Sequence, residues 1–270
     1  MVMQKGLSMN ARIIGSGKET IVLAHGYGGD QSVWDKVAPK LGESFQVVLF
    51  DWCFSGATKD RNGEFDAIKY SSYDAFADDL VSLLEELKLK SCVFVGHSMS
   101  GIIGCIASLK RPDLFNRLIL VASSPRFINH EDYEGGFERL EVQQLLINIE
   151  ENYDEWSSSF ASVGVDPIDP LSVQKFAKCL KRMGVEVGSP LAKTVFLSDY
   201  RSVLEKVITP CTLIHCKRDF VVPTSVATFM HNKIKGESTI EIVNGQGHFP
   251  QLTAHEEFLE IVLEALSSLI

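Results

Sequence analysis

A short glycine- and serine-rich motif, Gly96–Ser100, places a serine where it could act as a nucleophile. The motif follows an apolar run and opens a helix-forming stretch, and a serine in such a strand-to-helix turn is typical of a nucleophile elbow. The turn is sterically tight, so the residues two positions either side of Ser98 must be small, which Gly96 and Ser100 are. Ser100 stands where the usual pattern has glycine. A plain glycine- and serine-rich turn is the structural alternative.

A serine hydroxyl needs a base to take its proton and a carboxylate to orient that base. Two residues after later apolar runs supply these types in the order serine, acid, histidine: Asp219 and His248. We therefore predict a triad of Ser98, Asp219 and His248. Asp51, which also follows an apolar run, is the second choice for the acid. A turn-capping aspartate and an ordinary loop histidine are the structural alternatives.

A glycine-rich loop beginning at His25 follows the first strong apolar run. Such a loop supplies one backbone N–H to the oxyanion that forms during acyl transfer, and the residue after the nucleophile supplies the other. We predict Tyr27 and Met99 as these two donors. A glycine-rich turn that binds nothing is the alternative.

These residues require a scaffold that brings the ends of several strands together. Short, nearly continuous apolar runs are typical of parallel strands covered on both faces. Six such runs are present: Thr20–His25, Gln46–Phe50, Cys92–Gly96, Leu118–Ala122, Cys211–His215 and Thr239–Val243. Helical patterns lie between them: Ser32–Leu41, Tyr73–Leu87, Met99–Lys110, Ser225–Lys235 and Glu256–Leu269. The alternation predicts an α/β protein with a doubly wound, mostly parallel sheet.

The alternation stops between residues 125 and 197, which we predict to form an inserted four-helix lid. The lid helices are expected at Gly136–Ile147, Ile149–Phe160, Leu171–Met183 and Ser189–Leu197. Residues 1–124 and 198–270 would then form the core. Because open α/β sheets bind ligands at the carboxyl ends of their strands, the lid is expected there. Its many aromatic rings either line a ligand cavity or attach the lid to the core.

Composition excludes several classes of function. The 270 residues are 45% apolar and 23% charged, as in ordinary globular proteins, and the net charge is −9. An acidic chain without a basic face is not expected to bind nucleic acid or anionic membranes. No secretory signal and no membrane-spanning run is visible, so the six cysteines are predicted to be reduced, in the cytoplasm or the nucleus. No metal or cofactor is expected.

At these motifs the chain resembles the plant strigolactone and karrikin (butenolide) receptor family of α/β-hydrolases. The resemblance covers nearly the whole chain. The segments that carry it are His25–Trp34, Gly96–Ser100, Arg111–Phe115, Ser124–Phe127, Asp132–Phe137, Phe196–Asp199 and Gly247–Leu252.

The resemblance implies an α/β-hydrolase fold and the same triad, with an apolar ligand pocket beneath the lid. The pocket would be lined by Tyr27, His97, Phe127, Phe137, Trp156, Phe160, Phe176, Phe196 and Val221. Three features depart from the main receptor groups: Tyr27 in place of the commoner phenylalanine, the bulky loop Asp51–Gly56, and Lys181–Val187 at a lid turn. They place the chain nearest the divergent DWARF14-like branch.

Three functions are compatible with these features. The first is a slow serine hydrolase and receptor for an apolar butenolide-type signalling molecule, with a signalling partner that docks on the lid. The second is a general carboxylesterase for small apolar esters or lactones. The third is a sensor that binds its ligand with little turnover. No nucleic acid or membrane partner is expected for any of them.

Overall fold

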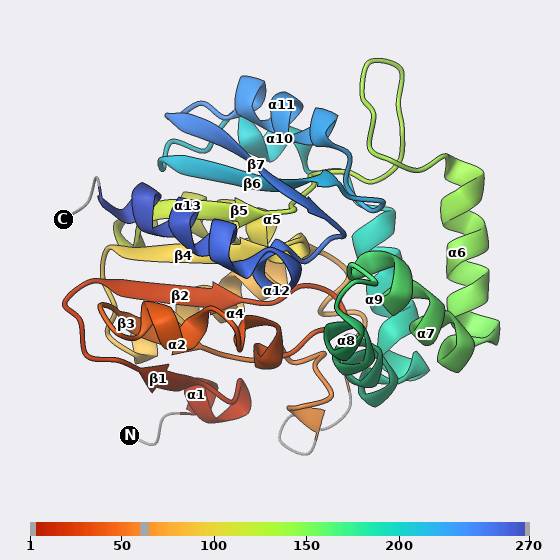
Figure 1. The fold of residues 1–270 in the computed structure, drawn as a ribbon, viewed down its shortest axis with the longest axis horizontal. Coiled ribbons are helices and arrows are strands. Elements are labelled where there is room, and N and C mark those ends of the chain that lie inside the picture. Colours follow the sequence, from red (N-terminus) through yellow and green to blue (C-terminus); the bar gives the residue numbers. More distant parts are fainter. Residues whose placement is uncertain (1–3, 60–64, 268–270) are drawn as a thin grey trace.

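A mixed sheet forms the centre of the protein, a computed structural model of which describes residues 4–59 and 65–267 (Figure 1). Within these residues the sheet has seven strands in the order β1-β3-β2-β4-β5-β6-β7. The strands are β1 Arg12–Ile14, β2 Thr20–Ala24, β3 Gln46–Leu49, β4 Cys92–His97, β5 Phe115–Val121, β6 Cys211–Arg218 and β7 Ser238–Gln246. All neighbouring pairs are parallel except β1 with β3, so the predicted mostly parallel sheet is present.

The apolar runs form strands because the sheet buries them on both faces. All six residues of β4 are buried, as are the last four of β2. The register pairs Ala24 with Gly96 and His97 with Val121, so β2, β4 and β5 end at the same edge. The loops after β2 and β4, which carry Tyr27 and Ser98, therefore begin side by side.

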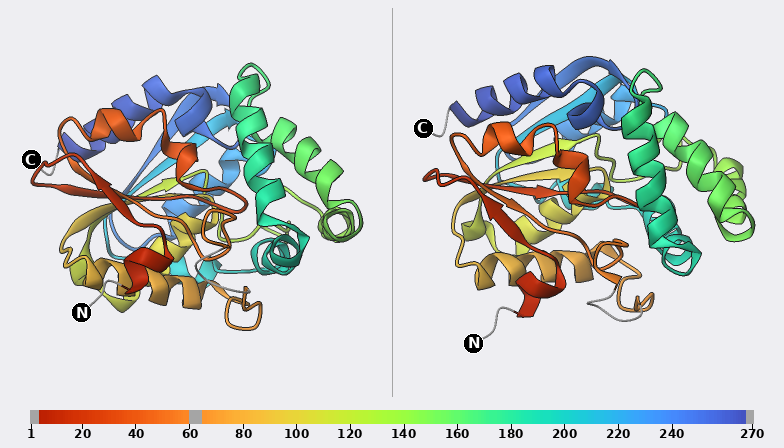
Figure 2. Two further views of the ribbon diagram at one scale, coloured as in Figure 1. Left: turned by 90° about the horizontal axis from the view of Figure 1, so that it is seen from below. Right: turned by 60° about the horizontal axis from the view of Figure 1, so that its bottom comes forward.

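Helices cover both faces of the sheet (Figure 2). One face is covered by α1 Gln4–Ser8, α4 Tyr73–Glu86, α5 Met99–Lys110, α10 Arg201–Leu204 and α11 Thr224–Lys233. The other face is covered by η1 Gln31–Trp34, α2 Ala38–Leu41, α12 Pro250–Thr253 and α13 His255–Ser267. A further 3₁₀ turn, η2 Pro112–Leu114, joins α5 to β5. This arrangement is the predicted doubly wound fold.

Four helices between β5 and β6 lie beyond the carboxyl ends of the strands (Figure 1). They are α6 Arg139–Glu151, α7 Tyr153–Gly164, α8 Pro170–Met183 and α9 Val185–Phe196, and we call them the lid. Three ion pairs join α8 to the segment around η1: Arg182–Asp30, Lys36–Asp169 and Lys175–Asp35. No helix among the described residues is long and apolar enough to cross a bilayer.

Several predicted boundaries were wrong, each for a local reason. The helix predicted at Ser32–Leu41 is two short pieces, since Pro39 at the start of α2 has no N–H for a continuous helix. Helix α6 begins at Arg139 because Glu138 and Glu141 form a capping box. Helix α9 begins at Val185, four residues before the predicted start at Ser189, and contains Pro190.

The other differences lie at helix ends, at strand ends and at the ends of the chain. The helix predicted at Ile149–Phe160 is α7, Tyr153–Gly164. The short β1 and α1 were missed. Strand β5 ends at Val121, one residue before its predicted end, whereas β6 and β7 extend beyond the predicted runs. The last two residues of the helix predicted at Glu256–Leu269 lie outside the described part of the chain.

Candidate active site

Ser98 lies in a strained turn between β4 and α5. Its φ of 56° falls in the left-handed region that non-glycine residues rarely adopt, and its N–H donates to Val121 O at 2.8 Å. A Cβ at Gly96 would lie 2.7 Å from Gly101 N, so only glycine fits that position. Backbone strain held in place by close packing is typical of functional sites.

Ser100 does more than meet the size limit of the turn. Its hydroxyl donates to His25 O at 2.5 Å and accepts from Trp52 Nε1 at 2.9 Å. Trp52 Nε1 also lies 3.0 Å from His25 O. The serine that replaces the usual glycine therefore ties the elbow to the loop after β2, and the large Trp52 is part of that connection.

The three predicted triad residues lie in a hydrogen-bonded row. His248 Nε2 is 2.9 Å from Ser98 Oγ, and His248 Nδ1 is 2.7 Å from Asp219 Oδ2. The second Asp219 oxygen accepts the N–H groups of Val221 and Val222 at 2.7 and 3.2 Å. The Asp219 side chain is fully buried, so its carboxylate is held by these bonds in a fixed orientation toward the imidazole.

Asp51, the alternative acid, is used elsewhere. It accepts Gln31 N at 2.8 Å and Asn10 Nδ2 at 2.7 Å, and it lies 3.6 Å from His25 Nε2. These contacts fix the loop after β2, and none of them involves His248. The geometry therefore favours Asp219 as the partner of His248.

His97 contacts the loop that carries His248. Its Nε2–H donates to His248 O at 2.8 Å, and its ring stacks at a tilt on Phe249, with centroids 4.5 Å apart. Burial, and then the nearby His248, hold the pKa of His97 well below its usual value. His97 is thus neutral at physiological pH and acts as a hydrogen-bond donor to the backbone of the loop.

The two predicted oxyanion donors flank the nucleophile. Met99 is the first residue of α5, and Tyr27 lies in the loop after β2. Neither backbone N–H donates to another described residue. Position 26 requires glycine, because a Cβ there would lie 2.9 Å from Ser98 Cβ. The loop and the nucleophile are therefore in close contact.

A small apolar cavity lies directly over the triad, with a volume of about 20 Å³. It is lined by Tyr27, His97, Ser98, Phe127, Phe160, Phe176, Val195, Phe196, Val221, His248 and Phe249. About 10–15 Å³ of such space holds one water molecule, so the closed cavity has room for roughly one. A substrate can enter only if aromatic rings of the lid move.

Seven of the nine predicted pocket residues line this cavity. The other two, Trp156 and Phe137, lie behind residues that line the cavity. Trp156 stacks on Phe160, with ring centroids 5.0 Å apart, and Phe137 packs edge-on against Phe196, with centroids 6.0 Å apart. Sequence reasoning missed two lining residues, Val195 and Phe249. Phe249 directly follows the predicted base His248, and Val195 directly precedes the predicted pocket residue Phe196. Their position next to predicted site residues was the sequence feature that could have identified them.

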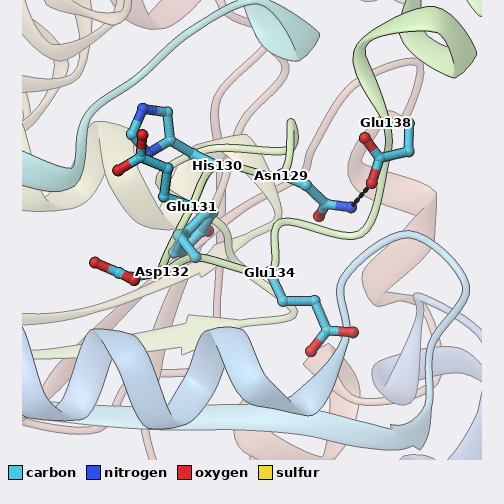
Figure 3. A pocket seen from close by; sticks show the side chains of 7 residues that line it. Asn129, His130, Glu131, Asp132, Glu134 and Glu138 are labelled. Carbon is cyan, nitrogen blue, oxygen red and sulfur yellow. Dashed lines mark hydrogen bonds between the residues drawn. The ribbon is translucent and has the colours of Figure 1, made fainter.

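A second hollow lies away from the triad, on the segment that joins β5 to α6 (Figure 3). Its lining is polar and largely acidic: Asn129, His130, Glu131, Asp132, Tyr133, Glu134 and Glu138. Asn129 Nδ2 donates to Glu138 Oε1 at 2.7 Å, which braces the segment. No serine, threonine or cysteine lines this hollow, in contrast to the cavity over Ser98.

Comparison with known proteins decides the family. A profile described as "Alpha/beta hydrolase family" matches residues 21–261. The chain belongs to the α/β-hydrolase family. The α/β-hydrolase fold predicted from the sequence is confirmed, and membership makes the protein a hydrolase.

Curated relatives of this α/β-hydrolase agree with the predicted resemblance. The chain is 40% identical over 261 residues to "Karrikin insensitive 2 receptor IA" of Petunia hybrida, covering 96% of this chain and 94% of the relative. It is 38% identical to "Strigolactone esterase D14" of Arabidopsis thaliana, covering 96% of both chains. The predicted resemblance to the strigolactone and karrikin receptor family is therefore confirmed.

A solved bacterial structure is also very similar. It is that of olei00960, a hydrolase from Oleispira antarctica, with a TM-score of 0.93 and 29% identity over 97% of this chain and 96% of that chain. The likeness includes the length of chain that forms the lid, so this architecture is not restricted to the plant relatives.

Proposed function

We propose that the protein is a slow serine hydrolase and a receptor for a small apolar butenolide-type molecule. The observation that carries this proposal is the hydrogen-bonded row from Ser98 to Asp219 at the floor of a closed aromatic cavity. The relatives named as karrikin receptor and strigolactone esterase support the substrate class.

In the proposed mechanism, Ser98 Oγ attacks the ester or lactone carbonyl while His248 Nε2 takes its proton. Asp219 holds the opposite Nδ1–H, so the correct ring nitrogen faces the serine. The negative charge on the carbonyl oxygen is stabilised by the N–H groups of Tyr27 and Met99.

Collapse of the tetrahedral intermediate breaks the bond to the leaving oxygen, which receives the proton from His248. The acyl group remains on Ser98. Water, activated by the same imidazole, then releases it and restores the free serine.

The closed cavity supports slow turnover. With room for about one water molecule, it requires displacement of lid rings before substrate enters and again before product leaves. Such gating steps limit turnover in many enzymes.

A receptor also needs a surface to which a partner protein can bind, and the lid has exposed apolar side chains. Leu140 and Ile147 are exposed on α6, and Ile168 and Leu171 at the start of α8. These side chains support the proposed docking of a signalling partner on the lid.

Mass spectrometry of the protein after addition of a synthetic butenolide tests the proposal. The expected result is an adduct on Ser98 in the wild type and none in Ser98→Ala. Because the variant loses only the Ser98 hydroxyl and its hydrogen bond to His248, the free energy of unfolding should change by less than about 1 kcal/mol. An adduct of equal yield in Ser98→Ala would refute the assignment.

A general carboxylesterase is the second candidate, because the same triad suits simple esters and the similar structure from Oleispira antarctica is described only as a hydrolase. Turnover of simple aryl esters and ligand-dependent melting separate the two. Fast multiple turnover without a ligand-dependent shift in melting temperature favours the esterase, whereas slow turnover with such a shift favours the receptor.

A further inference from the structure

The lid holds backbone and side-chain groups on both sides of the nucleophile. On one side, Tyr27 Oη donates to Gly188 O, in α9, at 2.8 Å. On the other, His248 N donates to Gly164 O, at the end of α7, at 2.6 Å. The residue that carries an oxyanion N–H and the residue that carries the base are each hydrogen-bonded to a different lid helix.

The Tyr27 side chain is enclosed almost entirely by the lid. Its ring makes edge contacts with Trp156 of α7 and Phe196 of α9, at centroid distances of 6.2 and 6.4 Å. Burial raises the pKa of Tyr27 well above its usual value, so the hydroxyl keeps its proton and acts as a donor. The position of the Tyr27 side chain thus depends on lid groups.

The residue after Tyr27 leaves the loop little freedom. Gly28 has φ +70°, and a Cβ there would lie 2.2 Å from Leu180 Cδ2 of α8. The loop is pressed against α8 at Gly28 and hydrogen-bonded to α9 one residue earlier. Displacement of α8 and α9 therefore removes two contacts that hold this part of the loop, while the bonds of His25 to the core remain.

We propose that Tyr27 is a positioning residue: the hydrogen bond from its hydroxyl to Gly188 O holds its own backbone N–H in the position that binds the oxyanion. This bond is present only when the lid is closed over the core. The inference rests on the proposed serine-hydrolase function and deepens it. Lid displacement, which entry to the closed cavity requires, breaks the bond and disorders the oxyanion site. Reseating over the substrate restores the bond, so bond cleavage is confined to the closed state.

Tyr27→Phe removes the bond to the lid and keeps the ring contacts. Loss of a whole oxyanion donor costs about 10²–10³ in kcat, so a donor that is present but misplaced should cost about tenfold. KM for 4-nitrophenyl acetate should stay within about twofold of the wild type, because the ground-state contacts remain. Inhibition by phenylboronic acid, which places a negative oxygen in the same site, should weaken by the same factor as kcat.

Tyr133→Phe is the matched control. Tyr133 Oη donates to Arg126 O at 2.7 Å, which is the same kind of bond, but it lies in the segment between β5 and α6 and makes no contact with Tyr27 or Gly188. Both variants lose one tyrosine-to-carbonyl bond, so their melting temperatures should fall by similar amounts. Only Tyr27→Phe should lower kcat.

The possible outcomes are distinct. If wild type and Tyr27→Phe have the same kcat and the same boronic acid affinity while both are folded, the inference is wrong. If Tyr133→Phe loses kcat equally, the effect is one of general stability and the inference is again wrong. If the wild type shows no turnover that depends on Ser98, the proposed function itself fails, which is a separate result.

Discussion

At the scale of single residues, the assignment of the acid is decided by orientation. Asp219 and Asp51 both follow strands, and both are buried. Only Asp219 reaches His248, because the N–H groups of Val221 and Val222 hold one oxygen and turn the other toward the imidazole. The sequence indicated the residue types and their order, but the direction of each carboxylate depends on these backbone bonds.

Asp219→Asn should lower kcat by about 10⁴-fold, because an amide favours the wrong imidazole tautomer. Steady-state hydrolysis of an aryl ester measures this. Asp166→Asn is the control, since Asp166 contacts Gln246 and Ile168 near the same loop without touching His248. Full activity in Asp219→Asn would mean that another group orients His248.

Ser98→Ala and His248→Ala should be about equally inactive, and the double variant little worse than either. The residues of a triad act as a unit, so their losses do not add. The same ester assay on all three variants checks this. Losses that multiply would show that His248 acts independently of the serine.

At the scale of elements, two lid phenylalanines occupy different environments. Phe160 of α7 is half-buried, stacks on Trp156 and lines the cavity over the triad. Phe176 of α8 is 2% exposed and packs on Phe249 with centroids 4.5 Å apart. Both rings line the cavity, but Phe160 stays partly exposed whereas Phe176 is almost completely buried against its neighbours.

Phe160→Ala should therefore change ligand affinity or substrate preference at modest cost in stability. Phe176→Ala should cost more in the free energy of unfolding, about 3 kcal/mol or more, the usual effect of emptying a packed site. Urea denaturation and hydrolysis of a series of aryl esters with increasing acyl length measure both quantities. If Phe160→Ala is the less stable variant and hydrolyses the series unchanged, the ring attaches the lid to the core and lines no ligand site.

The order of strands and helices was predictable from apolar periodicity, since the parallel sheet requires continuous apolar runs. Boundaries were less predictable, because they depend on single backbone bonds. Pro39 divides one predicted helix, and the capping pair Glu138 and Glu141 shifts another. The three-residue β1 was missed because Ile13 is half exposed and its run is too short to show a period.

At the scale of the whole molecule, a closed apolar pocket under the lid was expected from the sequence, but its size was not predictable. The sequence indicated that aromatic rings gather in the lid, which is compatible with a large cavity or a nearly filled one. Whether they leave space depends on how α7, α8 and α9 pack against the loop of Tyr27 and on the ion pairs that hold α8 to the η1 segment. These are long-range contacts, which local patterns do not encode.

The stability of the whole fold should also depend on pH through a histidine that takes no part in the proposed reaction. His215 of β6 is fully buried, and neither ring nitrogen has a hydrogen-bond partner among the described residues. Burial lowers the pKa of His215 to about 4, with the Asp219 carboxylate opposing this in part. In the unfolded chain the pKa of histidine is about 6.5.

Between pH 6.5 and pH 4 the unfolded chain therefore binds a proton that the folded protein does not, so stability is lost as the pH falls. From pH 6.5 to pH 5 the expected loss from this group is about 2 kcal/mol, at about 1.4 kcal/mol per pH unit. Urea denaturation of wild type and His215→Leu at pH 7.5 and pH 5 measures it, and the variant should lose less stability than the wild type by about that amount. The quantity compared is the change in stability with pH, so a constant loss of stability from imperfect packing of leucine does not affect it.

His231→Gln is the control, at an exposed histidine that contacts Ser238, and it should keep the wild-type slope of stability against pH. Equal slopes for all three proteins would show that His215 does not titrate between the two states in this range.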